Sequence, residues 1–229
     1  MRKSMIILIL YGIITLLNFD IVYAGSKVAV STKVKGKVEV RPNRNDVYKN
    51  LKTGNILEDK SQVKTGNNGF TAIIFIDDKS ILKIKENTEI EITGKRTAAK
   101  ISKKIFMDIG TLRAIVGQQR QGEFVIQTPT SVASVKGTDF WLSTDPIEGD
   151  LLITLDGNVL FTNTITGESI SVTGGNTGFS LPNGDLSVAT TDPATIPEDP
   201  SEVEEETGNE LRIYFEGPDG EEKSILIRY

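Results

Sequence analysis

Short runs of alternating apolar and polar residues, separated by turn residues about every 8 to 12 positions, recur along most of this chain. Such alternation turns one side of a strand toward a core and the other toward solvent, as in Val34 to Arg41. Phe70 to Ile76 is almost continuously apolar, which predicts a strand covered on both faces. Asp156-Gly157-Asn158, between two apolar runs, predicts a hairpin turn. No clear amphipathic helix competes, so the pattern predicts an all-β sandwich, barrel or roll over residues 27–189.

The first 24 residues have the three-part layout of a secretory signal peptide. Arg2 and Lys3 give a positive start, Met5 to Leu17 is an apolar run, and Val22-Tyr23-Ala24 offers small residues for cleavage. The run is shorter than the roughly 20 residues that span a bilayer, although an uncleaved anchor stays open as an alternative. We expect residues 1–24 to be removed and the mature chain to be exported to the periplasm or cell surface of a bacterium, with no integral membrane span.

The chain has no cysteine and no histidine. Thiol catalysis and Cys-type metal sites are therefore excluded, and the commonest general base and metal ligand are missing. We predict no enzyme activity, no metal and no cofactor. Two acidic groups are candidates for chemistry: Glu89 with Glu91 as a hydrolytic pair, and Asp145, Glu148 and Asp150 as a Ca²⁺ site. A solvated strand face and an ordinary acidic turn explain them more simply.

Charge is distributed unevenly along the sequence. Residues 25–120 hold 20 Lys and Arg against 10 Asp and Glu, whereas residues 190–229 hold three against 12. Lys33, Lys35 and Lys37 align on one strand face, as do Lys83 and Lys85. A further basic cluster consists of Lys95, Arg96, Lys100, Lys103 and Lys104. Such a surface could hold an anionic polysaccharide by charge alone. Nucleic acid is a poor candidate, because the chain is acidic overall and few aromatic residues lie among the lysines.

The C-terminal forty residues differ from the rest. Residues 190–210 combine Pro, Thr, Asp and Glu with almost nothing apolar, which predicts a disordered acidic linker. Residues 211–229 then predict a β-hairpin, and an isolated hairpin is marginal in water. We expect it to dock within this molecule, on another copy or on the sheet edge of an envelope protein. The docking residues would be Leu211, Ile213, Phe215, Ile225, Ile227 and Tyr229.

An ordered series of short motifs runs through the main domain. It includes Gly36-Lys37-Val38-Glu39-Val40, Val63-Lys64-Thr65-Gly66, Gly110-Thr111-Leu112-Arg113, Phe124 to Pro129, and Val135-Lys136-Gly137-Thr138-Asp139-Phe140. In order and spacing, the segment from Val34 to Ala189 resembles the FecR domain family of exported bacterial proteins. Lys136 stands where that family usually has Arg, and Lys79 where it has Gly.

The resemblance implies an all-β domain, a roll or a short β-solenoid of stacked hairpins, without a catalytic site. FecR-type regulators carry this domain outside the inner membrane, after a cytoplasmic anti-sigma segment, and it contacts an envelope receptor. Only four residues precede the apolar run here, so we do not expect that cytoplasmic segment. We expect a binding or scaffold module and an accessory of envelope signalling.

Within the motif series, Lys136, Gly137 and Thr138 are the first candidates for a functional stretch. Gly137 permits a close backbone approach or a bulge, and Lys136 and Thr138 would share one face of a strand. A bulge that closes the roll is the structural alternative.

Overall fold

We describe the fold from a computed structural model. It describes residues 26–96, 101–118, 124–201, 210–216 and 222–228, and the expected signal peptide lies outside them. Within these ranges the regular structure consists of 19 strands and one short 3-10 helix, η1 (Pro193–Thr195). The all-β prediction is confirmed. No described helix is long and apolar enough to cross a membrane.

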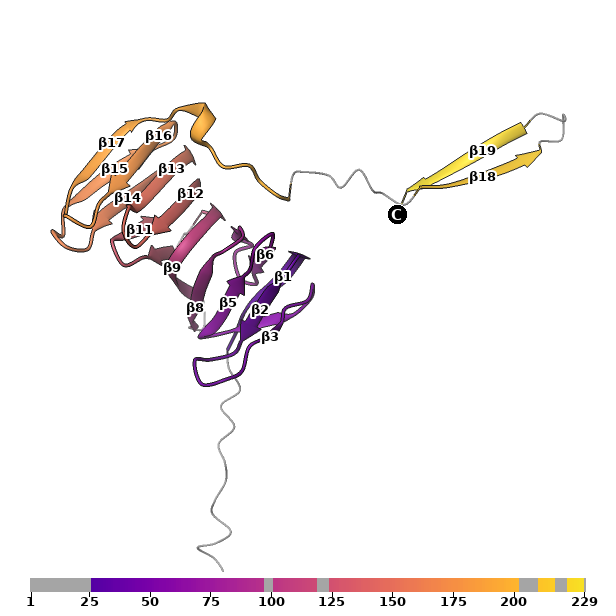
Figure 1. The fold of residues 1–229 in the computed structure, drawn as a ribbon, viewed down its shortest axis with the longest axis horizontal. Helices are drawn as coiled ribbons and strands as arrows, with labels where there is room; N and C mark the ends of the chain where they lie inside the picture. Colours follow the sequence, from indigo (N-terminus) through magenta and orange to yellow (C-terminus); the bar gives the residue numbers. More distant parts are fainter. Residues whose placement is uncertain (1–25, 97–100, 119–123, 202–209, 217–221, 229) are drawn as a thin grey trace, which may run out of the picture.

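Seventeen strands form two facing sheets, A and B, that share the long strand β9 (Figure 1). Sheet A consists, in spatial order, of β4 (Ile56–Glu58), β1 (Lys27–Lys35), β6 (Phe70–Phe75), β7 (Ile81–Ile84), the second half of β9 (Ile101–Val116), β12 (Thr138–Asp145), β13 (Gly149–Asp156), β16 (Asn176–Ser180) and β17 (Leu186–Thr190). Sheet B consists of β3 (Lys49–Asn50), β2 (Val38–Arg41), β5 (Ser61–Thr65), β8 (Glu89–Arg96), the first half of β9, β10 (Phe124–Gln127), β11 (Ser131–Val135), β14 (Asn158–Asn163) and β15 (Ser169–Thr173).

The strands are added as hairpins that alternate between the sheets. The hairpin β6–β7 lies in sheet A, β10–β11 in B, β12–β13 in A, β14–β15 in B and β16–β17 in A. Figure 1 shows that the colours follow the body from one end to the other, so successive hairpins stack along it. The pairing of β9 with β10 is parallel, and the other ladders are antiparallel. The body is therefore a short two-layered solenoid of stacked hairpins.

The hairpin predicted at Asp156-Gly157-Asn158 is wrong. β13 pairs with β12 and β16 in sheet A, whereas β14 pairs with β11 and β15 in sheet B. The turn therefore carries the chain from one sheet to the other. The apolar runs on its two sides face the same core from opposite layers, and this arrangement gives the same sequence pattern as a hairpin.

The long strand β9 changes sheets at Gly110. Residues 101–109 pair with β8 in sheet B, and residues 110–116 pair with β12 in sheet A. Gly110 has a φ of +116°, and a Cβ there would lie 2.2 Å from Thr88 Oγ1. Only glycine fits this bend, which makes the two sheets continuous.

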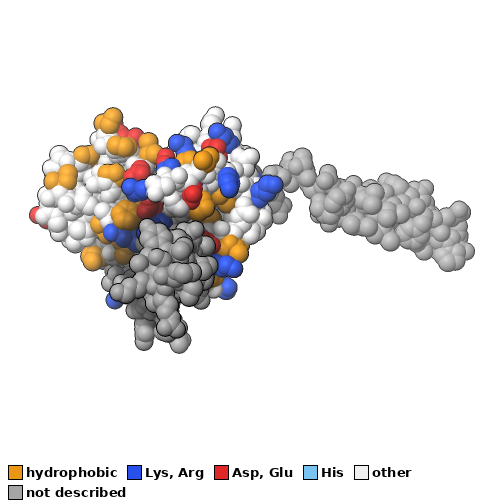
Figure 2. Space-filling view, turned by 90° about the horizontal axis from the view of Figure 1, so that it is seen from below, with side chains coloured by type: hydrophobic (Ala, Val, Ile, Leu, Met, Phe, Trp, Pro, Cys, Tyr) orange, Lys and Arg blue, Asp and Glu red, His pale blue; other side chains and the backbone are white. Residues whose placement is uncertain are grey.

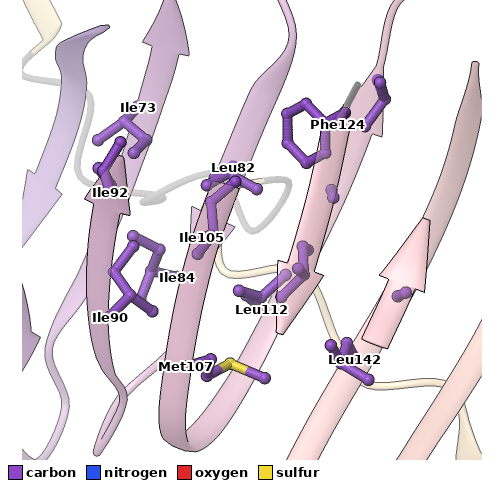
Figure 3. Packing of buried hydrophobic residues seen from close by; sticks show 14 of the residues in the cluster. Ile73, Leu82, Ile84, Ile90, Ile92, Ile105, Met107, Leu112, Phe124 and Leu142 are labelled. Atoms are coloured by element: carbon purple, nitrogen blue, oxygen red, sulfur yellow. The ribbon is translucent and has the colours of Figure 1, made fainter. Parts of the chain in front are cut away.

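The core fills the space between the sheets (Figure 3). Ile90, Ile92, Ile105 and Met107 of sheet B point toward residues of sheet A such as Leu112, and all are buried. The alternation in each strand supplies these residues at every second position. Residues Phe70 to Phe75 are buried on both faces except Ile74, as their continuous apolar run predicts. Sheet A must therefore be covered on its outer side as well.

The last two described strands, β18 (Glu210–Glu216) and β19 (Glu222–Arg228), form a separate two-stranded antiparallel sheet. Leu211 is opposite Ile227 in the register, and Ile213 is opposite Ile225. The predicted hairpin is therefore present. Its docking stays a prediction. Tyr229 and the hairpin's turn lie outside the described residues.

Candidate functional site: a cationic row on sheet A

One cross-strand row on the outer side of sheet A is rich in cations. The register places Lys33 of β1 beside Ala72 of β6, Ala72 beside Lys83 of β7, Lys83 beside Arg113 of β9, and Arg113 beside Trp141 of β12. Their strand neighbours Leu82, Leu112 and Phe140 belong to the core, so alternation turns the row outward. We call Lys33, Lys83, Arg113 and Trp141, together with nearby Lys85, the cationic row.

Residues 191–201, which we call the C-terminal segment, cover this row. After β17 the chain makes η1, whose start is capped by Asp192 accepting a hydrogen bond from the Ala194 amide. It then runs back along sheet A (Figure 1). Lys85 Nζ donates to the Glu198 carbonyl at 3.1 Å, and Lys33 Nζ donates to the Ser201 carbonyl at 3.3 Å. The expectation of a disordered linker is therefore wrong for residues 190–201; residues 202–209 lie outside the described ranges.

Asp199 is the centre of this contact. Its carboxylate oxygen Oδ2 lies 2.5 Å from Lys83 Nζ and 2.8 Å from Arg113 Nη1, and its side chain is only 4% exposed. The other oxygen accepts hydrogen bonds from the Ser201 amide and hydroxyl. Burial alone would raise the pKa of the Asp199 carboxyl. The hydrogen bonds from Lys83 and Ser201 outweigh burial and hold that pKa well below its ordinary value.

Arg113 is fixed in place from a second side. Its Nε and Nη2 donate to the two oxygens of Asp139 at 2.9 and 2.8 Å, which is a bidentate pair. The hydrogen bonds that Arg113 donates to Asp139 raise the pKa of Arg113 above its ordinary value, so the guanidinium stays charged. Because Asp139 lies on β12, this pair orients Arg113 without any contribution from the C-terminal segment.

Trp141 forms the apolar part of the row. It is 1% exposed, and both Lys85 Nζ and Arg113 Cζ lie 5.9 Å from the centroid of its ring. This is within the range of a cation–π contact. Its Nε1 has no hydrogen-bond acceptor in the described part of the chain. Phe140, the neighbour of Trp141 on β12, belongs to the core between the sheets, whereas Trp141 is buried on the outer side of sheet A.

A groove lies beside the covered row. It has a volume of about 340 Å³, and its lining includes Lys35, Phe70, Lys85, Glu198 and Pro200. Residues of the C-terminal segment thus form one wall, and residues of β1, β6 and β7 with their turns form the rest.

The structure divides the lysines that the sequence placed in one basic surface. Lys33 contacts the C-terminal segment, Lys35 lines the groove, and Lys37 is exposed and paired with Glu39 at 3.3 Å. Lys100 lies outside the described residues. On the face shown in Figure 2, basic and acidic side chains are interspersed among uncharged ones.

Lys103 is not a surface residue, contrary to expectation. Its side chain is 0% exposed, and its Nζ lies 2.9 Å from an Asp77 oxygen and 2.6 Å from an Asp78 oxygen. Lys103 occupies the inward-facing position of β9, two residues from Ile105, so alternation carries it into the core. Its neighbour Lys104 is half-buried, over the ring of Phe106.

Lys136, Gly137 and Thr138 form the corner between β11 in sheet B and β12 in sheet A. Gly137 has a φ of +147°, and a Cβ on the neighbouring corner residue Gly157 would lie only 2.6 Å from the Gly137 carbonyl oxygen. Lys136 is exposed and Thr138 is buried, so they do not meet a common ligand on one surface. The structure thus gives this stretch the geometry of a packed corner.

The two acidic groups are part of the framework. Arg44 and Gln62 hydrogen-bond Glu91, and although burial would raise the pKa of Glu91, these bonds lower it, which does not suit a general acid. Glu89 is bonded to Tyr48 and Lys64. Asp145 accepts from the backbone amides of its own turn.

Asp150 is buried between the layers and receives hydrogen bonds from three hydroxyls, those of Thr128, Ser131 and Thr144. Burial raises the pKa of its carboxyl, and the three hydroxyls oppose that rise. The cluster ties the turn between β10 and β11 in sheet B to sheet A. Among the described residues no group of three acids could hold a metal ion.

No sequence pattern predicted that Arg113 binds both Asp139 and Asp199. Asp199 lies in a segment whose composition predicts disorder, and 86 positions separate it from Arg113. A signal was present in part, since the continuous apolar run of β6 required a cover for sheet A. Composition alone could not show that an acidic segment provides it.

Comparison with known proteins gives one family. Residues 61–160, from β5 into β14, match the family model described as FecR protein. Two crystal structures of a candidate anti-sigma factor from Parabacteroides distasonis align at 12% identity, with TM-scores of 0.49 and 0.48. Each alignment covers 57% of this chain and 60% of that chain. No curated protein matches. The resemblance found in the motifs is confirmed over this range of the β body, where residues 61–160 match the FecR model.

Proposed function

We propose that this chain is an exported, non-enzymatic binding module of the cell envelope, whose FecR-domain body supports a C-terminal hairpin that binds a partner protein. The observation that carries the proposal is the separate two-stranded sheet of β18 and β19. A lone hairpin is marginal in water, and addition to a partner's sheet edge is a common way to stabilise one. The hairpin therefore serves as the recognition element.

The body anchors the segment that precedes this hairpin. Lys83 and Arg113 form ion pairs with Asp199, and Lys33 donates a hydrogen bond to the Ser201 carbonyl, so this segment is fixed on sheet A. Eight residues, 202–209, connect Ser201 to β18. At about 3.5 Å per residue they reach at most about 30 Å. A partner that takes up the hairpin is therefore brought close to the body.

Export rests on the sequence of residues 1–24, with its positive start and short apolar run. A chain without cysteine has no disulfide to form outside the cytoplasm, so the two-layered core must provide the stability. Within the described ranges, the buried cluster between the two sheets contains 27 apolar residues, which is enough for this purpose.

Binding of an anionic polysaccharide to the basic half is the competing function. Lys33 and Lys83 contact the chain's own acidic segment, and Lys103 is buried between the sheets. These three cations are thus engaged inside the molecule, which favours a protein partner over a glycan.

The proposal is tested by cross-linked capture from the native envelope. The full mature chain is compared with a chain that ends at Ser201. This shorter chain lacks the hairpin but keeps the ion pairs of Asp199 with Lys83 and Arg113. One envelope protein recovered only with the hairpin, at low and high salt, is the expected result. Equal recovery by both chains, or recovery of glycan that falls with salt, would overturn it.

A further inference from the structure

We infer that the cationic row is a binding site for an acidic peptide of a partner protein, and that residues 198–201 are an internal ligand of that site. The inference does not depend on the hairpin. It concerns a different surface, the outer side of sheet A, and it can hold or fail independently of the function proposed above.

The contacts match a peptide rather than a small anion. Lys85 and Lys33 donate to main-chain carbonyls, those of Glu198 and Ser201, which any peptide offers. Between them Lys83 and Arg113 bind one carboxylate, that of Asp199. Two backbone contacts therefore fix the direction of the segment, and one carboxylate contact selects an acidic residue at its centre.

The carboxylate site is formed in advance. Asp139 holds Arg113 through two hydrogen bonds that do not involve the C-terminal segment. The row carries four cations, and departure of Asp199 would remove a buried carboxylate from their midst. A preorganised cation with further cations beside it favours an acidic replacement over an empty site.

The internal ligand leaves part of the site unused. Trp141 Nε1 is buried and has no acceptor among the described residues, which is a costly state for a hydrogen-bond donor. The groove of about 340 Å³ along Phe70 and Pro200 also has room for a further side chain. A partner peptide that accepts a hydrogen bond from Trp141 Nε1 and fills the groove would make more contacts than residues 198–201 do. Without the effect of the tether, it would therefore bind more tightly.

The internal segment has the advantage of attachment. A ligand tethered by a short linker acts at an effective concentration in the millimolar range. A free peptide of equal quality must therefore bind the unmodified chain much more weakly than a chain whose own segment is released. This difference makes the inference measurable.

The test uses the full chain carrying Asp199→Asn and a synthetic peptide with the sequence of residues 196–205. Trp141 is the only tryptophan of the chain, so its fluorescence reports directly on the row. We expect saturable binding to the variant, at least about tenfold tighter than to the unmodified chain. The control is the same peptide with Asn in place of its Asp, which should bind the variant at least about tenfold more weakly, as loss of a buried charge pair implies.

Absence of saturable binding to the variant, or equal binding of the two peptides, would overturn the inference. Should Asp199→Asn prevent folding, Ser201→Ala provides a milder release, since it removes one hydroxyl hydrogen bond to Asp199 and leaves the cations intact. It should bind the acidic peptide more tightly than the unmodified chain does. Lys37→Ala, which changes an exposed lysine outside the row, should leave the peptide affinity unchanged.

Discussion

The ammonium of Lys103 and the carboxylate of Asp78 meet 2.6 Å apart and join the two sheets. Lys103 comes from the half of β9 in sheet B, and Asp78 from the turn between β6 and β7 in sheet A. A lysine that is 0% exposed keeps its charge at low cost only when acids surround it, and Asp77 supplies a second one. The pair therefore closes one edge of the core.

Substitution of Lys103 should be costly both for the charge imbalance and for the unfilled volume that it leaves. Lys103→Ala removes the cation from two acids and should lower the free energy of unfolding by about 3 kcal/mol. Lys103→Met keeps most of the volume and should cost less. Urea unfolding measures both, and Lys104→Ala, at the half-buried neighbour, should stay within about 1 kcal/mol of the parent. Equal effects at positions 103 and 104 would contradict this role.

The bend at Gly110 gives a second test. Gly110→Ala would place a Cβ against the backbone and side chain of Thr88 at a positive φ, and should cost at least about 2 kcal/mol of stability. Gly175→Ala is the matched control, because Gly175 also has a positive φ but no atom within 4 Å of the added Cβ. It should cost about 1 kcal/mol. A smaller loss at Gly110 than at Gly175 would show that β9 does not need this bend.

Asp150 should make stability depend on pH in a particular direction. Its folded pKa is raised above the ordinary value of 3.8, so its protonated form is favoured in the folded state. The resulting stability is fully present below the unfolded pKa and is lost as the pH rises through the folded pKa. Asp150→Asn should remove this contribution. The free energy of unfolding of the parent minus that of the variant should therefore fall as the pH rises from about 3, and then level off. A pH-independent difference would contradict it.

Asp199 should act in the opposite direction. Its folded pKa is lowered, so its contribution is present above the ordinary value of 3.8 and is lost as the pH falls through the folded pKa. Acidification should release the C-terminal segment from sheet A before the body unfolds. The fluorescence of Trp141 should then change in the parent, whereas Asp199→Asn should lack this step. The same acid step in both proteins would place its origin elsewhere.

The strands were predictable because their signal is local. Alternation at every second residue is enough to predict that Ile90 and Ile92 face a core, and the motif order was enough to suggest the FecR domain. The sheet to which each strand belongs was not predictable in the same way. Asp156-Gly157-Asn158 has the composition of a hairpin turn, yet it connects two layers, because either geometry buries the apolar residues around it.

The candidate site depends on contacts between distant residues. Composition correctly marked residues 190–201 as acidic and poor in apolar side chains. It could not show that Lys83 and Arg113 neutralise Asp199 across more than 80 positions. For the same reason the sequence pattern predicts a surface charge at Lys103, since its acidic partners lie 25 or more residues away.

Hydrogen exchange of β18 and β19 in the purified full chain tests the central proposal most directly. A hairpin that awaits a partner should have backbone amides that exchange rapidly in the isolated protein at low concentration, while core strands such as β12 stay protected. Addition of the captured envelope partner should then protect one edge of the hairpin. Slow exchange of both strands in the isolated monomer would contradict the account, because it would mean that the hairpin already docks within its own chain.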